Sequence, residues 1–226
     1  MFDDLILSAA LIVYASLVAY LTKSAYDWMI NRSIKKKDAI YYNRKLVHIF
    51  AGGVIALIVP FFSDPIYPLL SGIILAVFTY ISHKRGKMLY WFQTDDDIND
   101  VSFCLMWGVA VYALWAIMGN PWIAIIPLVF MAFGDGVTGI VRNAIFKKRT
   151  KHPIGNVFML ALCIPMGYIL VHFSGIPEMA MWGVIAAIVA SVVERYEIGP
   201  IDDNILITVS SSIVLYIGYM VSVMGI

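Results

Sequence analysis

Residues 122–141 read WIAIIPLVFMAFGDGVTGIV, an apolar run in which Asp135 is the single charged side chain. A run of about 20 apolar residues is the length that an α-helix needs to cross a lipid bilayer. An ionised carboxylate inside such a span is costly unless it is paired, bound to a metal or placed in a wet cavity. The stretch therefore predicts a transmembrane helix with a functional or paired acid within it.

Other apolar runs precede and follow this one, and together they fill the chain. The sequence is 61% hydrophobic and 14% charged, whereas soluble domains carry about a quarter charged residues. We expect an all-α fold, a polytopic integral membrane bundle of about eight transmembrane helices, formed by a single membrane domain, residues 1–226. The predicted spans cover residues 5–21, 46–59, 66–82, 101–118, 122–141, 153–173, 179–193 and 205–223.

The cationic side chains predict the orientation of these spans. All 16 Lys and Arg residues can be placed on one side, because loops that carry them alternate with loops that carry none. By the positive-inside rule the basic side is cytoplasmic and both termini lie outside. Short loops and no evident cleavable signal favour a prokaryotic plasma membrane. Cys104 and Cys163 fall inside apolar runs, so we expect no disulfide framework.

Several polar groups are predicted to lie at the basic side. Asp135, Thr138 and Arg142 are spaced i, i+3, i+7 and share one helix face. The alternative for Asp135 is a neutral or paired acid that ties two helices together. Gly134 and Gly136 beside it permit close helix packing, let a phosphate or its metal approach the backbone, or do both.

The predicted second span begins with another polar group. Arg44 and His48 are four residues apart, so they point the same way, and Lys45 lies beside them. Arg44 and Lys45 can be read as ordinary interfacial anchors. His48 lies about one turn deeper, where a simple anchor is not required.

The last basic-side loop is acidic at both ends. Glu194 closes the seventh predicted span, and Asp202-Asp203-Asn204 open the eighth. One of these three is expected as a helix N-cap. Two carboxylates and an amide in a row exceed what a cap needs, and they offer the oxygen ligands that Mg²⁺ prefers.

Two loop clusters have simpler interpretations. Asp95-Asp96-Asp97 with Asp100 is best explained as a solvated loop or a helix cap, with a metal or substrate role as the minority view. Lys147 and Lys148 are topology signals or contacts for anionic lipids. Lys151, next to the sixth span, could reach a phosphate.

Cations, carboxylates and glycines on one face fit a nucleoside triphosphate with Mg²⁺. Phosphoryl transfer needs cations on the phosphate oxygens, a metal held by carboxylates and an oriented acceptor. A lipid hydroxyl would arrive between the helices, and the nucleotide would arrive from the cytoplasm. The sequence contains no Walker A loop and no protein-kinase motif set.

The order of these motifs over residues 40–215 resembles that of the dolichol kinase and phytol kinase family, which is related to the phosphatidate cytidylyltransferases. Members are polytopic enzymes that phosphorylate polyprenols or phytol, typically with CTP and Mg²⁺. The motifs that carry the resemblance are Arg44-Lys45-x-x-His48, Gly134-Asp135-Gly136, Lys151 in its basic loop, Glu194 and Ile201-Asp202-Asp203-Asn204-Ile205.

The resemblance implies roles for individual residues. Asp135 would hold Mg²⁺ or orient the acceptor hydroxyl, and Asp202 and Asp203 would complete the metal site. His48 and Glu194 would support catalysis or handle protons. The expected cofactor-binding residues are Arg44, Lys45, Gly134, Gly136, Arg142, Lys151 and Asn204.

The chain departs from the family pattern at two places. After the Asp135 helix the family usually continues with a Gly-rich stretch, and here residues 141–144 read VRNA. After Lys151 the family usually has Glu-Gly-Ser, and here residues 152–156 read HPIGN, which keeps Gly155 and has no Glu. An altered nucleotide, an altered chemistry or a lost activity are the alternatives that this change raises.

The leading hypothesis is a CTP-dependent kinase for an isoprenoid alcohol. The runner-up is a lipid-phosphate cytidylyltransferase, and third is a non-enzymatic transporter or scaffold, which the uncharged outer halves of the spans disfavour. The expected partners are a lipid alcohol and a nucleotide, with no nucleic acid; a homo-oligomer is compatible with the sequence. The lipid, its chain length and the base are left open.

Overall fold

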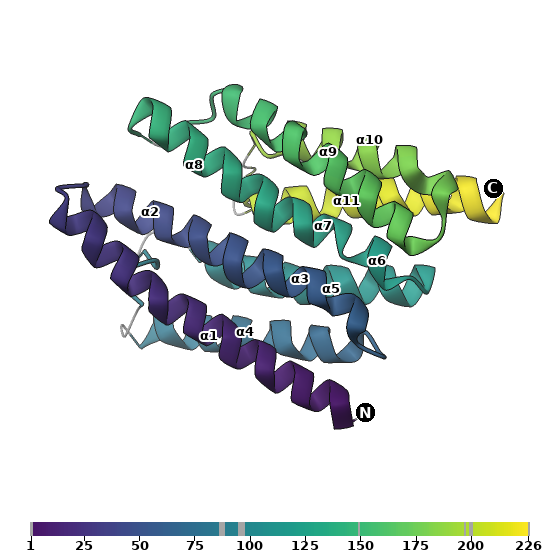
Figure 1. The fold of residues 1–226 in the computed structure, drawn as a ribbon, viewed down its shortest axis with the longest axis horizontal. Helices are drawn as coiled ribbons and strands as arrows, with labels where there is room; N and C mark the ends of the chain where they lie inside the picture. Colours follow the sequence, from purple (N-terminus) through teal and green to yellow (C-terminus); the bar gives the residue numbers. More distant parts are fainter. Residues whose placement is uncertain are drawn as a thin grey trace.

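The computed structural model describes residues 2–85, 89–94, 98–148, 150–196, 198 and 201–225. Throughout these ranges the regular structure is helical, apart from an isolated β-bridge between Ile198 and Ile201. The helices lie side by side along the long axis (Figure 1), so the predicted all-α bundle is confirmed. The elements are α1 (Phe2–Asn31), α2 (Lys36–Val47), η1 (His48–Gly53), α3 (Val54–Ile58), η2 (Val59–Phe61), α4 (Ile66–Lys84), α5 (Asn99–Met118), α6 (Pro121–Ala124), α7 (Ile126–Val129), η3 (Phe130–Gly134), α8 (Asp135–Phe146), α9 (Ile154–Ser174), η4 (Pro177–Met179), α10 (Ala180–Val193), α11 (Asp203–Tyr219) and η5 (Met220–Met224).

Consecutive elements join into long apolar segments. In the part of the chain that the structure describes, 7 helical segments are long and apolar enough to cross a membrane, compared with about eight predicted spans. The remaining predicted span, residues 179–193, falls in the shorter apolar segment Pro177–Val193. The long segments are Phe2–Asn31, Lys36–Phe61, Ile66–Lys84, Asn99–Met118, Pro121–Phe146, Ile154–Ser174 and Asp203–Met224.

One turn shows how the sequence separates two of these segments. Gly119 ends α5 with φ of 64°, a left-handed conformation that glycine adopts without steric cost. Asn120 then caps the next helix, since its side-chain oxygen accepts from the Trp122 amide at 3.1 Å and the Ile123 amide at 3.3 Å. Pro121 takes the first helical position, where its missing N–H costs nothing. The chain therefore passes from one apolar segment to the next in a tight turn.

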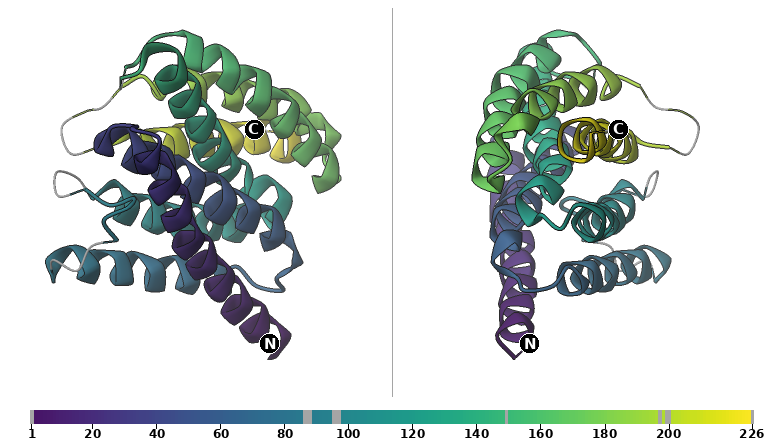
Figure 2. Two further views of the ribbon diagram at one scale, coloured as in Figure 1. Left: turned by 60° about the vertical axis from the view of Figure 1, so that its left-hand side comes forward. Right: turned by 90° about the vertical axis from the view of Figure 1, so that its right-hand side faces the viewer.

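The segment Pro121–Phe146 forms the centre of the bundle. In its 18-residue apolar stretch, 83% of the residues are buried inside the structure, against 6% in the corresponding stretch of α1. In Figure 1, α7 and α8 lie between α9 and α10 on one side and α2 and α3 on the other. By contrast, α1 runs obliquely across the outside of the bundle (Figure 2). The helix that carries Asp135 is therefore the one most shielded by the others.

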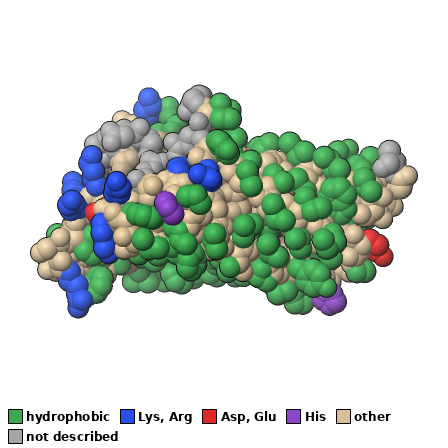
Figure 3. All heavy atoms as spheres, turned by 90° about the horizontal axis from the view of Figure 1, so that it is seen from above, with side chains coloured by type: hydrophobic (Ala, Val, Ile, Leu, Met, Phe, Trp, Pro, Cys, Tyr) green, Lys and Arg blue, Asp and Glu red, His purple; other side chains and the backbone are tan. Residues whose placement is uncertain are grey.

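The charged side chains divide the bundle into two ends. Figure 3 shows Lys and Arg side chains gathered at one end, with hydrophobic side chains covering most of the rest of this face. The turn between α1 and α2 lies at that end, and both termini point away from it (Figure 1). The arrangement matches the alternation of cationic and uncharged loops in the sequence. We refer to this region as the basic end.

Candidate functional site

Asp135 lies at the start of α8, where the π-helical turn η3 ends. Its Oδ2 atom is 2.5 Å from Lys45 Nζ and 3.4 Å from His48 Nδ1. The Asp135 side chain is 2% exposed, and the Lys45 and His48 side chains are also buried. A buried carboxylate of this kind needs a partner to remain charged, and Lys45 supplies it. The structure thus brings together three of the predicted residues from two distant segments.

Arg142, about two turns further along α8, forms a separate ion pair with Glu194. The guanidinium donates to both carboxylate oxygens, with Nη1 to Oε1 at 2.7 Å and Nη2 to Oε2 at 2.8 Å. It also donates to Asn156 Oδ1 at 2.9 Å and, through Nε, to the carbonyl of His152 at 2.9 Å. Both charged partners are almost fully buried. A two-pronged contact of this kind fixes orientation as well as charge, so it clamps α8 to the end of α10.

Gly155 makes room for this clamp. A Cβ atom at that position would lie 2.4 Å from Arg142 Nε and 2.9 Å from its Cζ. We expect Gly155→Ala to lower the free energy of unfolding by about 1–3 kcal/mol, the usual cost of overpacking. The control is Val157→Ala, an exposed position on the same helix. Equal unfolding midpoints for the two variants in detergent would contradict this account.

Lys151 joins the acidic groups of two helices. Its Nζ donates to Asp203 Oδ2 at 2.9 Å and to the Glu194 carbonyl at 2.8 Å, and lies 3.5 Å from Glu194 Oε1. Burial alone would lower the pKa of the Lys151 ammonium, but the carboxylates of Asp203 and Glu194 outweigh it and hold the pKa above its usual value. Lys151 is therefore a permanent cation of the site.

Three buried carboxylates meet between these cations. Oxygen atoms of Asp135, Glu194 and Asp203 all lie within 4.8 Å of one another. Carboxylate oxygens are the ligands that Mg²⁺ prefers, and small shifts would bring such atoms to a shared ion. Nearby, the buried Asn204 Oδ1 finds no hydrogen-bond partner among the described residues, so a further oxygen remains for a ligand. The donor set fits Mg²⁺.

The charges of this cluster balance without any ligand. The anions Asp135, Glu194 and Asp203 are paired with Lys45, Arg142 and Lys151 respectively. Glu194 has both oxygens engaged by Arg142, whereas Asp135 and Asp203 are each paired with a lysine. Lysine carries a point charge on a flexible stem and can turn to another anion more readily than a two-pronged arginine can. Asp135 and Asp203 are therefore the better placed pair to exchange their partners for a metal.

Asp202 faces a different way from Asp203. It is the N-cap of α11, with Oδ1 accepting from the Ile205 amide at 3.0 Å. Its Oδ2 accepts from Ser102 on α5 and from Asn204 Nδ2 at 3.3 Å. Burial raises the pKa of the Asp202 carboxyl, and the hydrogen bonds from Ser102 and Ile205 oppose this. The cluster of three carboxylates thus contains Glu194 and not Asp202, for which a metal role was predicted.

The glycines of the Asp135 motif serve packing. A Cβ at Gly134 would lie 2.8 Å from Cys163 Sγ, and one at Gly136 would lie 2.6 Å from Ile49 Cγ1. Neither glycine lines the small polar pocket that lies beside Lys45, Lys151 and Glu194. A third glycine, Gly139, borders the site directly, because its missing Cβ leaves the space that Lys45 Cε occupies. Of the two interpretations of these glycines, the contacts support close helix packing.

A small polar pocket opens onto the cluster. It contains six of the predicted residues together with Tyr41, Asn99 and Thr150, which the sequence interpretation missed. Tyr41 could have been found, since it lies four residues before Lys45 on the same helix face and Lys45 Nζ sits 5.4 Å from its ring centroid. The pocket residues are Tyr41, Arg44, Lys45, Asn99, Arg142, Thr150, Lys151, Glu194 and Asp203.

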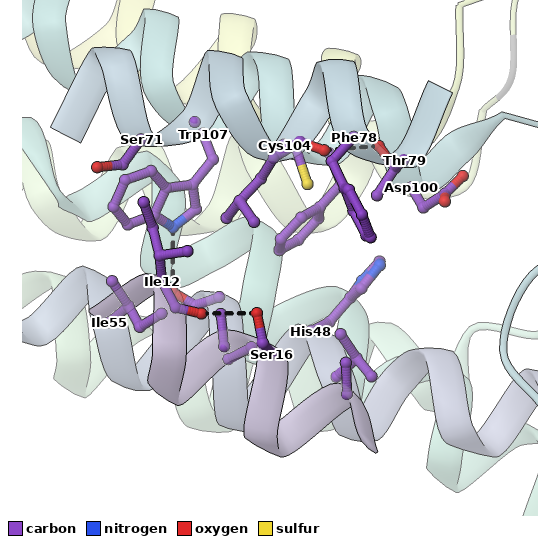
Figure 4. Close-up of a pocket in the computed structure, with 18 of the residues that line it drawn as sticks. Ile12, Ser16, His48, Ile55, Ser71, Phe78, Thr79, Asp100, Cys104 and Trp107 are labelled. Atoms are coloured by element: carbon purple, nitrogen blue, oxygen red, sulfur yellow. Dashed lines mark hydrogen bonds between the residues drawn. The ribbon is translucent and has the colours of Figure 1, made fainter. Parts of the chain in front are cut away.

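An apolar cavity of about 150 Å³ adjoins the polar pocket, and Arg44 lines both. The cavity lies between α1, the segment Lys36–Phe61, α4 and α5 (Figure 4). His48 lines it as well, which confirms that Arg44 and His48 point the same way. The bundle thus places an apolar cavity directly beside a charged pocket.

Asp100 lies at the polar end of the cavity rather than in the polar pocket. It accepts from Gln93 and lies 2.9 Å from His83 Nε2, so it ties α4 to α5. The neighbouring Asp95, Asp96 and Asp97, for which a loop or cap was expected, lie outside the described residues.

Comparison of the chain with known protein families, with curated proteins and with solved structures finds no match.

Proposed function

We propose that this protein is a CTP-dependent kinase that phosphorylates an isoprenoid lipid alcohol at the cytoplasmic face of a prokaryotic plasma membrane. The observation that carries the proposal is the shared wall at Arg44. On one side lies a pocket lined by Glu194 and Asp203 of the buried carboxylate cluster and by cations, and on the other lies an apolar cavity. A soluble nucleotide and a lipid acceptor could meet there.

The residues of the pocket and of the adjoining carboxylate cluster match the needs of phosphoryl transfer. Such a reaction requires a metal bound to the phosphates, cations on their oxygens and an oriented acceptor. In the proposal Asp135 and Asp203, with Asn204 beside them, would hold Mg²⁺, and the bound ion would supply positive charge to the transferred phosphate. Arg44, Lys45 and Lys151 bind the phosphate oxygens, Asp202 keeps the start of α11 in place, and His48 orients the acceptor hydroxyl or takes its proton.

Glu194 and Arg142 form the support of this site. Their ion pair consumes both oxygens of the Glu194 carboxylate and holds the ends of α8 and α10 together. Lys151 rests on the Glu194 carbonyl through a 2.8 Å hydrogen bond. In the proposal Glu194 is a positioning residue that aims Lys151 at the phosphates.

The choice of CTP, and of an isoprenoid acceptor, rests on the resemblance of the ordered motifs to the dolichol kinase and phytol kinase family. The same pocket would also suit transfer of CMP to a lipid phosphate, since both reactions need a metal and cations on a triphosphate. The two reactions differ in the phosphorus that enters the lipid product: the γ-phosphorus of CTP for the kinase and the α-phosphorus for the cytidylyltransferase.

The test is label transfer by the purified protein with Mg²⁺. CTP labelled at the γ- or the α-phosphate is offered with prenols and with prenyl phosphates. Label from the γ-position on an alcohol supports the kinase, and label from the α-position on a lipid phosphate would replace it with a cytidylyltransferase. No transfer from CTP, ATP or GTP would overturn an enzymatic role and favour a transporter or scaffold.

Lys151 offers a more specific test of nucleotide binding. We expect Lys151→Met to raise the KM for the nucleotide by about 10-fold to 100-fold, because one charge-assisted phosphate contact is lost. Lys148→Met, an exposed cation in the same loop, is the control and should behave as wild type. Since the pKa of Lys151 is raised, its cation is lost only as the pH rises through that raised value. Deprotonation of Lys151 should therefore not raise the wild-type KM for the nucleotide at any pH below about 10, which is the ordinary pKa of lysine.

A further inference from the structure

The end of α1 and the start of α2 form a small hairpin at the basic end, residues 22–43. Asn43 closes this α1–α2 hairpin, because its buried Nδ2 donates to the Thr22 carbonyl at 2.7 Å. The hairpin is a folded unit with a core of its own, separate from the main core of the bundle. Four buried residues form that core: Tyr26, Met29, Ala39 and Ile40.

The α1–α2 hairpin carries the excess positive charge of the protein. Its five cations are Lys23, Arg32, Lys35, Lys36 and Lys37, and it has two anions, whereas the rest of the chain contains eleven cations and thirteen anions. The formal net charge of +1 is therefore the sum of a positive hairpin and a negative remainder.

The hairpin cations also differ from those of the polar site in their partners. Lys45, Arg142 and Lys151 are each paired with a buried carboxylate. Within the described ranges none of the five hairpin cations forms an ion pair, and all of them except Lys23 are exposed. Their charge is thus available to an anion outside the protein.

Large apolar side chains are exposed on the same hairpin. Trp28 is 55% exposed and Ile30 is 38% exposed. The Arg32 guanidinium lies over the Trp28 ring, 4.5 Å from its centroid. Tryptophan is enriched where a membrane meets water, and cations there meet the lipid phosphates. Solvation by water explains the exposed cations but not an exposed tryptophan among them.

The position of Trp28 along α1 places it at the level of the lipid headgroups. It follows Leu21, the end of the apolar run, by seven residues, which is about 10 Å along the helix axis. The headgroup layer is about 5–8 Å thick on each side of the hydrocarbon. Because α1 runs obliquely (Figure 2), its depth changes by less than its length. Trp28 therefore lies within or directly beside that layer.

The lysines at the start of α2 lie at nearly the same depth. Ala39 shares a core with Met29, the neighbour of Trp28, and it follows Lys36 by only three residues. The attraction between a cation and an anionic membrane surface extends over about one Debye length, roughly 8 Å at physiological salt. These lysines are thus within reach of lipid phosphates.

We propose that the α1–α2 hairpin is a docking surface for the headgroups of anionic phospholipids. Its exposed cations bind the phosphates, and Trp28 and Ile30 pack against the adjoining acyl chains. An acidic soluble protein would match the charge but would leave the exposed tryptophan at headgroup depth without a role. The proposal concerns the hairpin alone and does not depend on the kinase activity.

The docked lipid also has a consequence for the polar pocket. Arg44 and Lys45 follow Lys37 on the same helix, α2, after about two turns. Headgroups bound at the start of α2 therefore hold the helix that supplies two of the cations in the pocket.

The test counts the lipids bound to the full-length protein by native mass spectrometry in a mild detergent. The hairpin variant is Lys35→Gln/Lys36→Gln/Lys37→Gln. The matched control removes the same charge from exposed cations in two other loops of the basic side, Lys84→Gln/Arg85→Gln/Lys148→Gln. Dioleoylphosphatidylglycerol is the anionic probe, and dioleoylphosphatidylcholine has the same acyl chains without net charge.

We expect the hairpin variant to bind phosphatidylglycerol at least about tenfold more weakly than wild type, since a single cation near an anionic lipid contributes a factor of about five. The control variant should lose much less, and binding of phosphatidylcholine should be unchanged in both. A rise in ammonium acetate from about 0.05 M to about 0.5 M should weaken the binding of phosphatidylglycerol to wild type, because salt screens the charges.

A second pair of variants tests the apolar part of the surface. Trp28→Ala removes the exposed ring from the hairpin, and Phe2→Ala removes a ring that is 74% exposed at the opposite end of the same helix. We expect Trp28→Ala to weaken the binding of phosphatidylglycerol at least about threefold, because buried apolar contact is lost. Phe2→Ala should match wild type.

Three results would overturn the proposal. One is wild-type binding of phosphatidylglycerol by the hairpin variant, and another is an equal loss in its matched control, which would make the attraction a property of the whole basic end. The third is binding of polyglutamate that depends on the three lysines without any preference for phosphatidylglycerol over phosphatidylcholine, which would assign the surface to an acidic polypeptide. Since all these readouts are of binding, a failure of phosphate transfer leaves them unchanged.

Discussion

Replacement of Asp135 with asparagine is expected to abolish phosphate transfer while the protein stays folded in the membrane. Asparagine keeps the shape of the side chain and removes the charge that pairs with Lys45 at 2.5 Å and would attract the metal. Loss of one preorganised electrostatic contact at a reacting centre typically costs about 100-fold to 1,000-fold in rate. We expect kcat/KM to fall by at least about 100-fold.

The measurement is transfer of the γ-phosphate label by equal amounts of protein purified from membranes. Asp64→Asn is the matched control, because Asp64 is a carboxylate that caps the Ile66 amide at an exposed turn away from the pocket. Activity close to wild type in the Asp135 variant would remove this residue from the site.

Removal of the Arg142 guanidinium should have the largest effect on stability. In Arg142→Met the Glu194 carboxylate stays buried and loses the two hydrogen bonds that the guanidinium donates to it. Breaking a buried ion pair by removing one partner costs about 3–5 kcal/mol, because the other charge is left uncompensated. We expect a loss of that size in the free energy of unfolding, measured in detergent.

The double variant Arg142→Met/Glu194→Leu tests the cause. Replacing both charges with apolar side chains of similar volume is often nearly neutral, so it should recover most of the stability and none of the activity. Arg32→Met is the control for loss of a cation, since Arg32 is exposed and packs over the Trp28 ring at 4.5 Å. An Arg142→Met variant as stable as Arg32→Met would show that the clamp contributes nothing.

The course of the helices was largely predictable, because the apolar runs and the cationic loops both leave clear signals. The helix ends were not. The first run was expected to stop at residue 21, but α1 continues to Asn31 through Lys23 and Asp27. A helix does not need apolar residues once it leaves the hydrocarbon region, so hydropathy marks where a span leaves the bilayer and not where the helix ends.

The partners of the site residues were harder to predict than the residues themselves. Asp135, Thr138 and Arg142 share a face as the spacing requires, yet Asp135 pairs with Lys45 and Arg142 with Glu194. Thr138 lies between them, with its hydroxyl 3.4 Å from Glu194 Oε1. Helical spacing determines the direction in which a side chain points, but its partners come from other helices, whose rotation the sequence does not reveal.

The division of labour between Asp202 and Asp203 could not be read from the sequence for a related reason. The two residues are adjacent, and the exact start of α11 decides which one caps the helix. Asp202 has extended backbone angles and accepts from the Ile205 amide, so Asp203 becomes the first helical residue and turns toward Lys151. If the helix began one residue later, Asp203 would be the cap instead.

The pairing of charges in the site also has a consequence for biosynthesis. When the central segment Pro121–Phe146 leaves the ribosome, Lys45 has already been made, so Asp135 can be neutralised as soon as the segment inserts. Arg142 and Lys151 must wait for Glu194 and Asp203, which are translated about fifty residues later. The last two helices thus supply the carboxylate partners of Arg142 and Lys151, and until they are made these two cations of the central cluster have no such partner.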